Sequence, residues 1–240
     1  MVKHNGKTIK RFGKYSVIDC RSCKFIHIVP IPSNQELNSF YDNEYYQNTK
    51  PNFISKNENE MDYWNSVFDE KLVTIEKLIS SKSKRILDIG SGPGFFLRRA
   101  KRRGWDVIGV EPSPLASDYA NKQNIHTIQK FFHEVTPNEI GKFDAIHTFD
   151  VLEHVNNPID IIKKAYSLLK KGGIIVVEVP NDFNPLQKLV QKKLKKKEWW
   201  LTLSHNLKNP GPDPMSSILF DFDEINFSMV ASFSSNTRFQ

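Results

Sequence analysis

Two carboxylates and three glycines near the middle of the chain have the types and spacing of a nucleotide site. Asp88 stands two residues before Gly90, glycine recurs at Gly92 and Gly94, and Glu111 closes the next apolar run. A glycine loop lets the backbone approach a ligand closely, and a carboxylate after the second strand can accept hydrogen bonds from both ribose hydroxyls. This pattern predicts that a nucleotide-like ligand binds between the loop and Glu111.

The segments around these residues alternate between strand and helix patterns. Apolar runs at 85–89 and 106–110 predict strands, and helical spacing at 95–103 predicts a helix between them. The same patterns predict further helices and strands downstream, the helices at 114–123 and 159–169 and the strands at 126–129, 143–149 and 174–179. Strands and helices that alternate in this way form a parallel sheet covered on both faces. The predicted fold class is therefore α/β, with a doubly wound, mostly parallel, Rossmann-like sheet.

The two ends of the chain interrupt this alternation. Near the amino end the patterns predict two strands and two helices, the strands at 15–20 and 24–29, a short helix at 34–41 capped by Ser33, and an amphipathic helix at 57–81. Towards the carboxyl end, a strongly basic helix at 188–197 precedes a tail rich in Pro, Ser and Phe. We therefore expect three parts: an amino-terminal module at 1–56, the sheet domain at 57–183, and a substrate or cap region at 184–240.

The only two cysteines, Cys20 and Cys23, lie in the turn between the first two predicted strands. A Cys-x-x-Cys turn supplies two of the four ligands that tetrahedral zinc needs. No second cysteine pair is present, and His4 and His27 are the only histidines nearby in the sequence. We therefore expect two reduced thiols and no metal site, with zinc binding as the alternative. Cysteines so placed favour a reducing, cytoplasmic setting.

The net charge of +7, with a pI near 9.2, raises the question of an acidic partner. The basic excess is concentrated at 82–103 and 188–197, and such patches are more typical of solvated helix faces than of nucleic-acid sites. Two alternatives remain for the basic helix, a lid over an anionic substrate and weak contact with a membrane surface. No run of about 18 apolar residues is present, so we expect no transmembrane segment.

The spacing of the glycines distinguishes between nucleotides. A dinucleotide site needs Gly-x-Gly-x-x-Gly, because the third glycine allows the helix to pack closely near the pyrophosphate. The chain instead has Gly-x-Gly-x-Gly, followed by Phe95. Asp88 would repel a pyrophosphate, but it suits a ligand with an ammonium group. S-adenosylmethionine carries an amino-acid tail and a ribose but no phosphate, and it fits both carboxylates. An NAD-dependent oxidoreductase is the disfavoured alternative.

Several motifs resemble those of class I S-adenosylmethionine-dependent methyltransferases. The first motifs are Asp88-Ile-Gly-Ser-Gly-Pro-Gly94 and Glu111-Pro112, and the later ones follow in the same order at 143–146, 150–155 and 168–181. The resemblance covers about residues 80–185. The cysteine turn and the segment at 32–46 are similar to the start of methyltransferases with an amino-terminal zinc-binding module, some of which act on nucleotide-linked sugars. Those relatives normally carry another cysteine pair upstream.

This resemblance implies roles for individual residues around the cofactor. Gly90, Gly92 and Gly94 would let the backbone approach the methionine moiety, while Asp88 orients its ammonium group. Glu111 would bind the ribose hydroxyls. Pro112 or Ser113 would flank the adenine, and Asp150 would lie at the carboxyl edge of the sheet. The loop at 130–132 would contact the adenine ring, and our own expectation there is that Phe131 stacks on it.

The resemblance also implies the chemistry. A sulfonium is an activated methyl donor, so the protein mainly has to align the reacting atoms and exclude water. A base is needed only where the acceptor must lose a proton; His154 is the first candidate and His205 the second. A packing role for His154 is an equally weighted alternative. We therefore predict a methyltransferase acting on a small-molecule acceptor by in-line displacement, with a non-catalytic S-adenosylmethionine-binding protein as the main rival.

Overall fold

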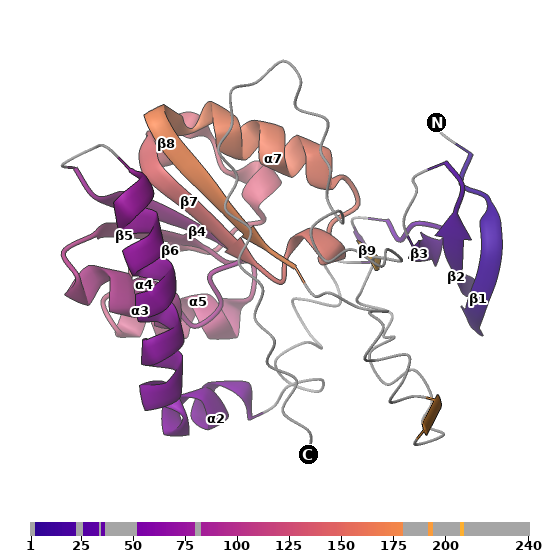
Figure 1. Cartoon of the computed structure of the whole chain (residues 1–240), viewed down its shortest axis with the longest axis horizontal. Helices are drawn as coiled ribbons and strands as arrows, with labels where there is room; N and C mark the ends of the chain where they lie inside the picture. Colours follow the sequence, from indigo (N-terminus) through magenta and orange to yellow (C-terminus); the bar gives the residue numbers. More distant parts are fainter. Residues whose placement is uncertain are drawn as a thin grey trace.

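The computed structural model describes residues 3–22, 26–33, 35–36, 52–79, 83–179, 192–193 and 207–208. Its main body is a five-stranded sheet in the order β6-β5-β4-β7-β8, and all neighbouring strands are parallel (Figure 1). The strands are β4 (Arg85–Ile89), β5 (Asp106–Val110), β6 (Thr127–Ile128), β7 (Phe143–Phe149) and β8 (Leu169–Glu178). The predicted doubly wound, parallel α/β fold is confirmed.

Helices cover both faces of this sheet, and each face has its own hydrophobic core. One core contains residues of α3 (Met61–Leu78), α4 (Phe95–Arg102) and α5 (Pro114–Lys122), and the other contains residues of α7 (Pro158–Ser167). Leu72 and Leu97 are fully buried in the first core. Full burial of one such side chain contributes about 1.5–3 kcal/mol. The two cores fix the strands that carry the glycine loop and the carboxylates.

The amphipathic helix predicted at 57–81 is wrong at its boundaries. It is two helices, α2 (Phe53–Asn59) and α3, and α3 ends at Leu78. Glu60 lies between them with a φ of −101° and a ψ of 17°, outside the helical region. The Asn57 side chain also donates to the Phe53 carbonyl oxygen over 2.7 Å. Asparagine favours such local bonds and is a weak helix former, which explains the break.

The helix predicted at 159–169 is also wrong at its carboxyl end. Helix α7 ends at Ser167, and β8 already begins at Leu169. Gly172 and Gly173 lie inside the strand, where its pairing with β7 shifts register. Gly172 has a φ of +76°, and a Cβ on Gly173 would lie 3.1 Å from the Asp144 carbonyl oxygen. Glycine here permits a bulge and a close backbone approach.

The amino-terminal module forms a separate antiparallel sheet of β1 (Gly6–Phe12), β2 (Tyr15–Cys20) and β3 (Ile26–Val29), joined by β9 (Leu207–Lys208). The strands predicted at 15–20 and 24–29 correspond to β2 and β3, and their antiparallel pairing confirms the predicted turn between them. Strand β1 was not predicted, because its sequence GKTIKRF is too basic to show an apolar run. Charged residues are common on edge strands.

Several predictions fall partly or wholly on residues that the structure does not describe. Ser33 and Glu36 form a reciprocal capping arrangement, with the Glu36 amide donating to the Ser33 hydroxyl over 3.2 Å. Residues 37–41 of that predicted helix lie outside the described residues, as do Cys23 and His205. Of the predicted basic helix at 188–197, residues 192–193 are described, and they are helical.

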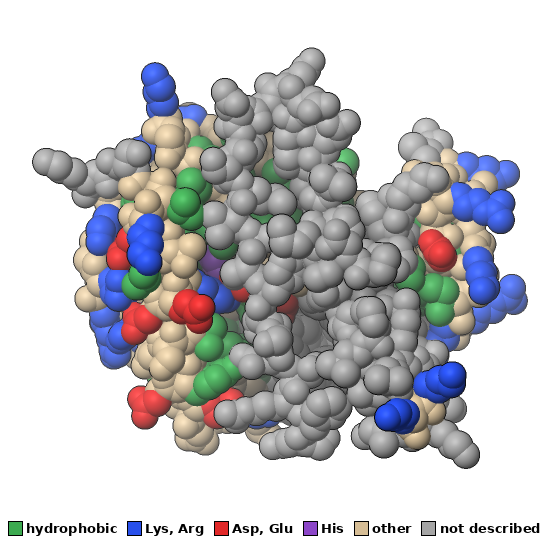
Figure 2. All heavy atoms as spheres, in the orientation of Figure 1, with side chains coloured by type: hydrophobic (Ala, Val, Ile, Leu, Met, Phe, Trp, Pro, Cys, Tyr) green, Lys and Arg blue, Asp and Glu red, His purple; other side chains and the backbone are tan. Residues whose placement is uncertain are grey.

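Much of the basic excess at 82–103 is paired. Arg99 binds Asp69, and Arg103 binds Glu76 over 2.6 Å, joining α4 to α3. Figure 2 shows acidic and basic side chains interspersed over this side of the molecule. This pairing agrees with the expectation that the basic patch at 82–103 is a solvated helix face. No helix among the described residues is long and apolar enough to cross a membrane.

Candidate functional site

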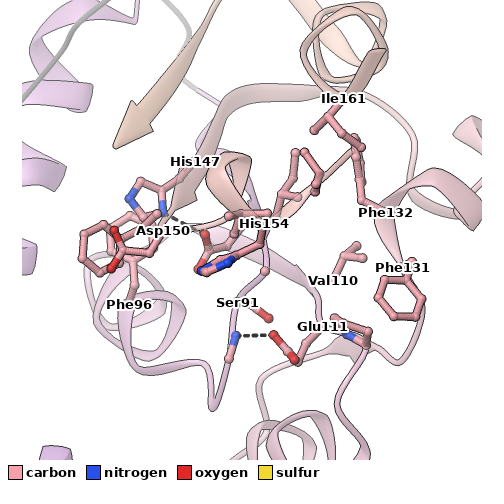
Figure 3. A pocket seen from close by; sticks show the side chains of 18 of the residues that line it. Ser91, Phe96, Val110, Glu111, Phe131, Phe132, His147, Asp150, His154 and Ile161 are labelled. Atoms are coloured by element: carbon pink, nitrogen blue, oxygen red, sulfur yellow. Dashed lines mark hydrogen bonds and ion pairs between the residues drawn. The ribbon is translucent and has the colours of Figure 1, made fainter. Parts of the chain in front are cut away.

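A cavity of about 760 Å³ opens at the carboxyl edge of the main sheet. The connections after β4 and β7 diverge there, because β4 pairs with β5 on one side and with β7 on the other. Ligands of open α/β sheets bind at such a switch point. The lining includes most of the predicted cofactor residues, namely Asp88, Gly90, Gly92, Glu111, Pro112, Phe131 and Asp150. The predicted base His154 also lines it, and Figure 3 shows His154 between His147 and Glu111.

The glycine loop needs its glycines for two different reasons. Gly90 has a φ of +72°, and a Cβ there would lie 2.3 Å from the Cγ2 atom of Val151. Only glycine fits both the conformation and the space. Gly94 precedes α4 with a φ of +76°, and it is not among the lining residues. A Cβ there would lie 3.1 Å from the Ala120 side chain, so Gly94 allows helix packing rather than ligand approach.

Glu111 is buried at the end of β5 and faces the glycine loop. Its two carboxylate oxygens accept hydrogen bonds from the backbone N–H groups of Gly92 and Ser113, each over 2.9 Å. Burial raises the pKa of Glu111 to about 7; these two hydrogen bonds lower it, and the nearby Asp88 charge raises it. Ser113 occupies the N-cap position of α5 but makes no side-chain capping bond.

A chain of four charged side chains crosses the carboxyl edge, and three of them, Lys71, Asp88 and His147, line the cavity. Asp88 Oδ1 lies 2.7 Å from His147 Nδ1, and His147 Nε2 lies 3.2 Å from Glu178 Oε1. Glu178 Oε1 also lies 2.7 Å from the Nζ atom of Lys71 on α3. Phe96 stacks on the His147 ring with centroids 4.1 Å apart. The chain thus links β4, β7, β8 and α3.

The protonation of His147 follows from its neighbours. When both neighbouring carboxyl groups are ionised they can only accept hydrogen bonds, so both ring nitrogens donate and the ring takes the imidazolium form. Burial lowers the pKa of His147, but the charge of Asp88 and the hydrogen bonds to Asp88 and Glu178 raise it overall. Burial raises the pKa of Glu178, yet His147 and Lys71 lower it overall. Two anions and two cations then alternate, so the buried chain is neutral.

The sequence reasoning missed Lys71, His147 and Glu178. The two strand residues have a signal: His147 interrupts a strand that is otherwise almost unbroken in hydrophobicity, and Glu178 breaks a β-branched strand. A buried charge needs a partner, so these two residues on neighbouring strands were candidates to pair. Lys71 gave no such signal, because a lysine on an amphipathic helix is ordinary.

The loops after β6 and β7 also line the cavity, with Phe131 from the first and Asp150 from the second. Phe131 stacks on His133 with centroids 5.7 Å apart, and Figure 3 shows Phe131 near Glu111. Asp150 follows β7 with a φ of +53°, and its N–H donates to the Glu178 carbonyl oxygen over 3.0 Å. Positive φ at a residue other than glycine is strained and is concentrated at functional sites.

His154 and Glu153 lie on the short 3-10 helix η3 (Leu152–His154). The His154 side chain is about one-tenth exposed, and its Nε2 atom lies 3.8 Å from Glu153 Oε1. That separation is too long for a hydrogen bond, although opposite charges at this distance attract. Glu153 is buried and does not line the cavity. His154 therefore borders both the cavity and a buried carboxylate.

Comparison with known proteins gives the same assignment as the motifs. The ubiquinone biosynthesis O-methyltransferase of Acinetobacter baumannii (strain AYE) is 32% identical over 105 residues, covering 41% of this chain and 44% of the relative. The enzyme of the same name from Dechloromonas aromatica (strain RCB) is 32% identical over 113 residues, covering 45% and 49%. The chain therefore spans less than half the length of these curated relatives.

A solved structure shares the fold. The plantazolicin methyltransferase BpumL in complex with SAH superposes with a TM-score of 0.51 at 20% identity, covering 68% of this chain and 63% of that one. The model of a family described as "Methyltransferase domain" matches residues 63–229, more than half of the chain, and decides against the oxidoreductase alternative. The chain belongs to this methyltransferase domain family, which confirms the resemblance to class I S-adenosylmethionine-dependent methyltransferases.

Proposed function

We propose that the chain binds S-adenosylmethionine in the cavity and transfers its methyl group to a small-molecule acceptor. The observation that carries this proposal is the position of Glu111, buried at the end of β5 and joined to the glycine loop by the Gly92 N–H. Asp88 lines the same cavity from the end of β4. Glu111 could thus accept hydrogen bonds from a ribose, and Asp88 from an ammonium group.

The residues present fit this cofactor. Gly90 lines the cavity, and a Cβ there would collide with Val151, so the loop can take this turn beside the cavity only because the residue is glycine. Each carboxylate oxygen accepts more than one hydrogen bond, so Glu111 can keep its two backbone bonds and still accept from ribose hydroxyls. Pro112 and Phe131 would hold the adenine. The cavity volume of about 760 Å³ lies within the usual range for ligand sites, roughly 300–1,000 Å³.

The chemistry follows from positioning. The bound sulfonium supplies an already activated methyl group. The loop and Glu111 would hold the donor, while the aromatic residues Phe96 and Phe131 shield the cavity from water. His154 is the proposed base for acceptors that must lose a proton, because it lines the cavity and lies in the segment at 150–155 that resembles a methyltransferase motif. Asp150 is proposed to position ligand groups at the carboxyl edge.

The class of acceptor is a further proposal. The similar curated proteins are named as O-methyltransferases of ubiquinone biosynthesis, so hydroxyl acceptors are the first to test. An anionic acceptor is supported by the basic sequence at 188–197, and weak membrane-surface contact is its alternative. A reducing, cytoplasmic setting is supported by the buried Cys20.

Calorimetry with S-adenosylhomocysteine tests the cofactor, and methyl transfer to a panel of hydroxyl-bearing metabolites tests turnover. We expect binding, loss of binding in Gly90→Ala, and unchanged binding in Gly104→Ala. The second variant is a matched control, since Gly104 also has a positive φ, +84°, with nothing within 4 Å of its Cβ position. Binding without turnover on any acceptor would favour the non-catalytic rival. Binding of NADH but not of S-adenosylhomocysteine would refute the proposal.

A further inference from the structure

We propose that the amino-terminal sheet holds a zinc ion between His4, Cys20 and His27. The ligand atoms of these three side chains all lie within 4.8 Å of one another. Cys20 and His27 are buried, and His4 is half-buried. Zinc accepts both thiolate sulfur and imidazole nitrogen, and a site with three protein ligands takes a water molecule in the fourth position. None of the three lines the cavity at the main sheet, so this site is distinct from the methyltransferase site.

The strand pairing brings two of the three ligands to one face of the sheet. His27 pairs with Ile18 across the β2–β3 hairpin. Cys20 lies two residues after Ile18, so period-two alternation points both side chains to the same face. The ligands therefore converge because of strand register.

His4 is held against this face by the backbone before β1. Gly6 pairs with Cys20 at the end of the β1–β2 ladder. The Arg21 N–H donates to the Asn5 carbonyl oxygen over 2.8 Å, which fixes the residue next to His4. The His4 and His27 rings meet edge to face with centroids 4.8 Å apart, and Cys20 Sγ lies 3.9 Å from His4 Nδ1.

The tautomer of His27 is suited to metal binding. Its Nδ1 atom lies 2.9 Å from the Ile28 carbonyl oxygen, which can only accept, so Nδ1 carries the proton. The lone pair of the neutral ring is then on Nε2. Zinc-binding histidines typically donate their other ring N–H to a carbonyl or carboxylate in this way, which orients the ring. His27 thus already has the outer hydrogen bond that a zinc ligand needs.

The ligand separations are close to those of an occupied site. Zinc binds sulfur at about 2.3 Å and nitrogen at about 2.0–2.1 Å, so ligand atoms around tetrahedral zinc lie roughly 3.5 Å apart. The observed limit of 4.8 Å exceeds this by about one ångström. Small side-chain rotations would close that difference without moving the strands. Cys23 lies outside the described residues, and the proposal rests on the three ligands alone.

The site would stabilise a module whose described residues form only a small core. The buried cluster of this sheet contains Val17, Ile26 and Ile28, with Tyr15 packed against it. Such small units usually need a metal, a disulfide or a partner. Zinc at this position would join the segment before β1 to β2 and β3. The expectation of reduced thiols without metal rested on the missing second cysteine pair, and the two histidines now offer a replacement for it.

Metal analysis of the full chain, purified without a histidine tag and dialysed against metal-free buffer, tests the proposal. We expect about one zinc ion per chain in the parent protein. Cys20→Ser and His4→Asn should each lose most of this zinc. His126→Asn is the matched control, because His126 is exposed and outside the cluster, and it should keep the metal. His4 precedes β1, so its substitution leaves the strands intact.

Cobalt replacement provides a second measurement that does not depend on any variant. Cobalt(II) in the parent protein should show visible bands of tetrahedral coordination and a thiolate charge-transfer band in the near ultraviolet. Chelation should abolish these bands and speed limited proteolysis within residues 3–29. A parent protein that holds no zinc and shows no thiolate–cobalt band overturns the proposal. Zinc retained in both Cys20→Ser and His4→Asn also overturns it.

Discussion

The two edges of the main sheet carry similar charged residues and use them differently. At the amino edge, Asp144 is buried and accepts hydrogen bonds from the Arg85 N–H over 2.9 Å and from Lys170 Nζ over 2.8 Å. Arg85 also binds Asp106 over 2.8 Å. These four residues come from β4, β5, β7 and β8, and none of them lines the cavity. Their bonds join the beginnings of the strands.

At the carboxyl edge, the charges lie under or beside an opening. Asp88, His147 and Glu178 come from the ends of the central strands, and Lys71 approaches from α3. Asp88 and His147 line the cavity, as does Glu111 from the next strand. The difference follows from topology, because loops that diverge at a switch point leave space only at the carboxyl edge. The same kinds of charged side chain therefore stabilise the sheet at its amino edge and can bind a ligand at its carboxyl edge.

Breaking the buried chain at the carboxyl edge should have the largest effect on stability. Glu178→Leu would leave Lys71 without its ion-pair partner, although the Lys71 side chain is only 9% exposed. Removing one partner of a buried pair costs about 3–5 kcal/mol, because the other charge stays buried. Urea unfolding monitored by circular dichroism measures this loss.

The double variant Lys71→Met, Glu178→Leu is the control for that measurement. Replacing both partners by apolar residues leaves no unpaired lysine, so roughly half or more of the lost stability should return. If Glu178→Leu unfolds at the same urea concentration as the parent protein, the chain contributes nothing and the contrast between the two edges disappears.

The second largest effect is expected on ligand affinity, which should fall for a substitution at the carboxyl edge and not for one at the amino edge. Glu111→Ala should weaken binding of S-adenosylhomocysteine by about 1–3 kcal/mol, or about 5- to 150-fold, the scale of lost hydrogen bonds to a charged group. Asp144→Asn is the matched substitution at the amino edge, and it should leave the affinity unchanged while lowering stability. Calorimetry measures both. Equal affinity in Glu111→Ala and the parent protein would remove Glu111 from the ribose site.

The third effect concerns pH. Burial raises the pKa of Glu111 to about 7, so the carboxyl group is mostly ionised at pH 8 and mostly protonated at pH 6. The ionised form is the better acceptor for ribose hydroxyls, so the dissociation constant should rise about tenfold as the pH falls across that range. Glu111→Gln cannot ionise and should give a flat profile. A profile of equal slope in Glu111→Gln would assign the pH dependence to another group.

The cofactor side of the site was predictable because its signals are local. Asp88, the glycine loop and Glu111 lie within one strand–loop–helix–strand unit, and backbone sterics largely determine where they go. The chain from Asp88 to Lys71 was not predictable in the same way, since its members pair across strands and a helix that are distant in sequence. Strand order decides which of them meet, and no short motif encodes that order. The predicted end of the helix at residue 169 was wrong for a similar reason, since the bulge at Gly172 and Gly173 depends on the neighbouring strand.

The smallest effect is expected at the amino edge, where the Arg85–Asp106 pair is exposed. The Asp106 side chain is 67% exposed and that of Arg85 is 28% exposed, so water screens their attraction. Asp106→Ala should change the unfolding free energy by no more than about 0.5 kcal/mol, the usual scale for exposed ion pairs. Urea unfolding of Asp106→Ala and Glu178→Leu, measured side by side, compares the loss of one ion-pair carboxylate at each edge. A loss in Asp106→Ala as large as in Glu178→Leu would mean that burial does not explain the difference between the edges.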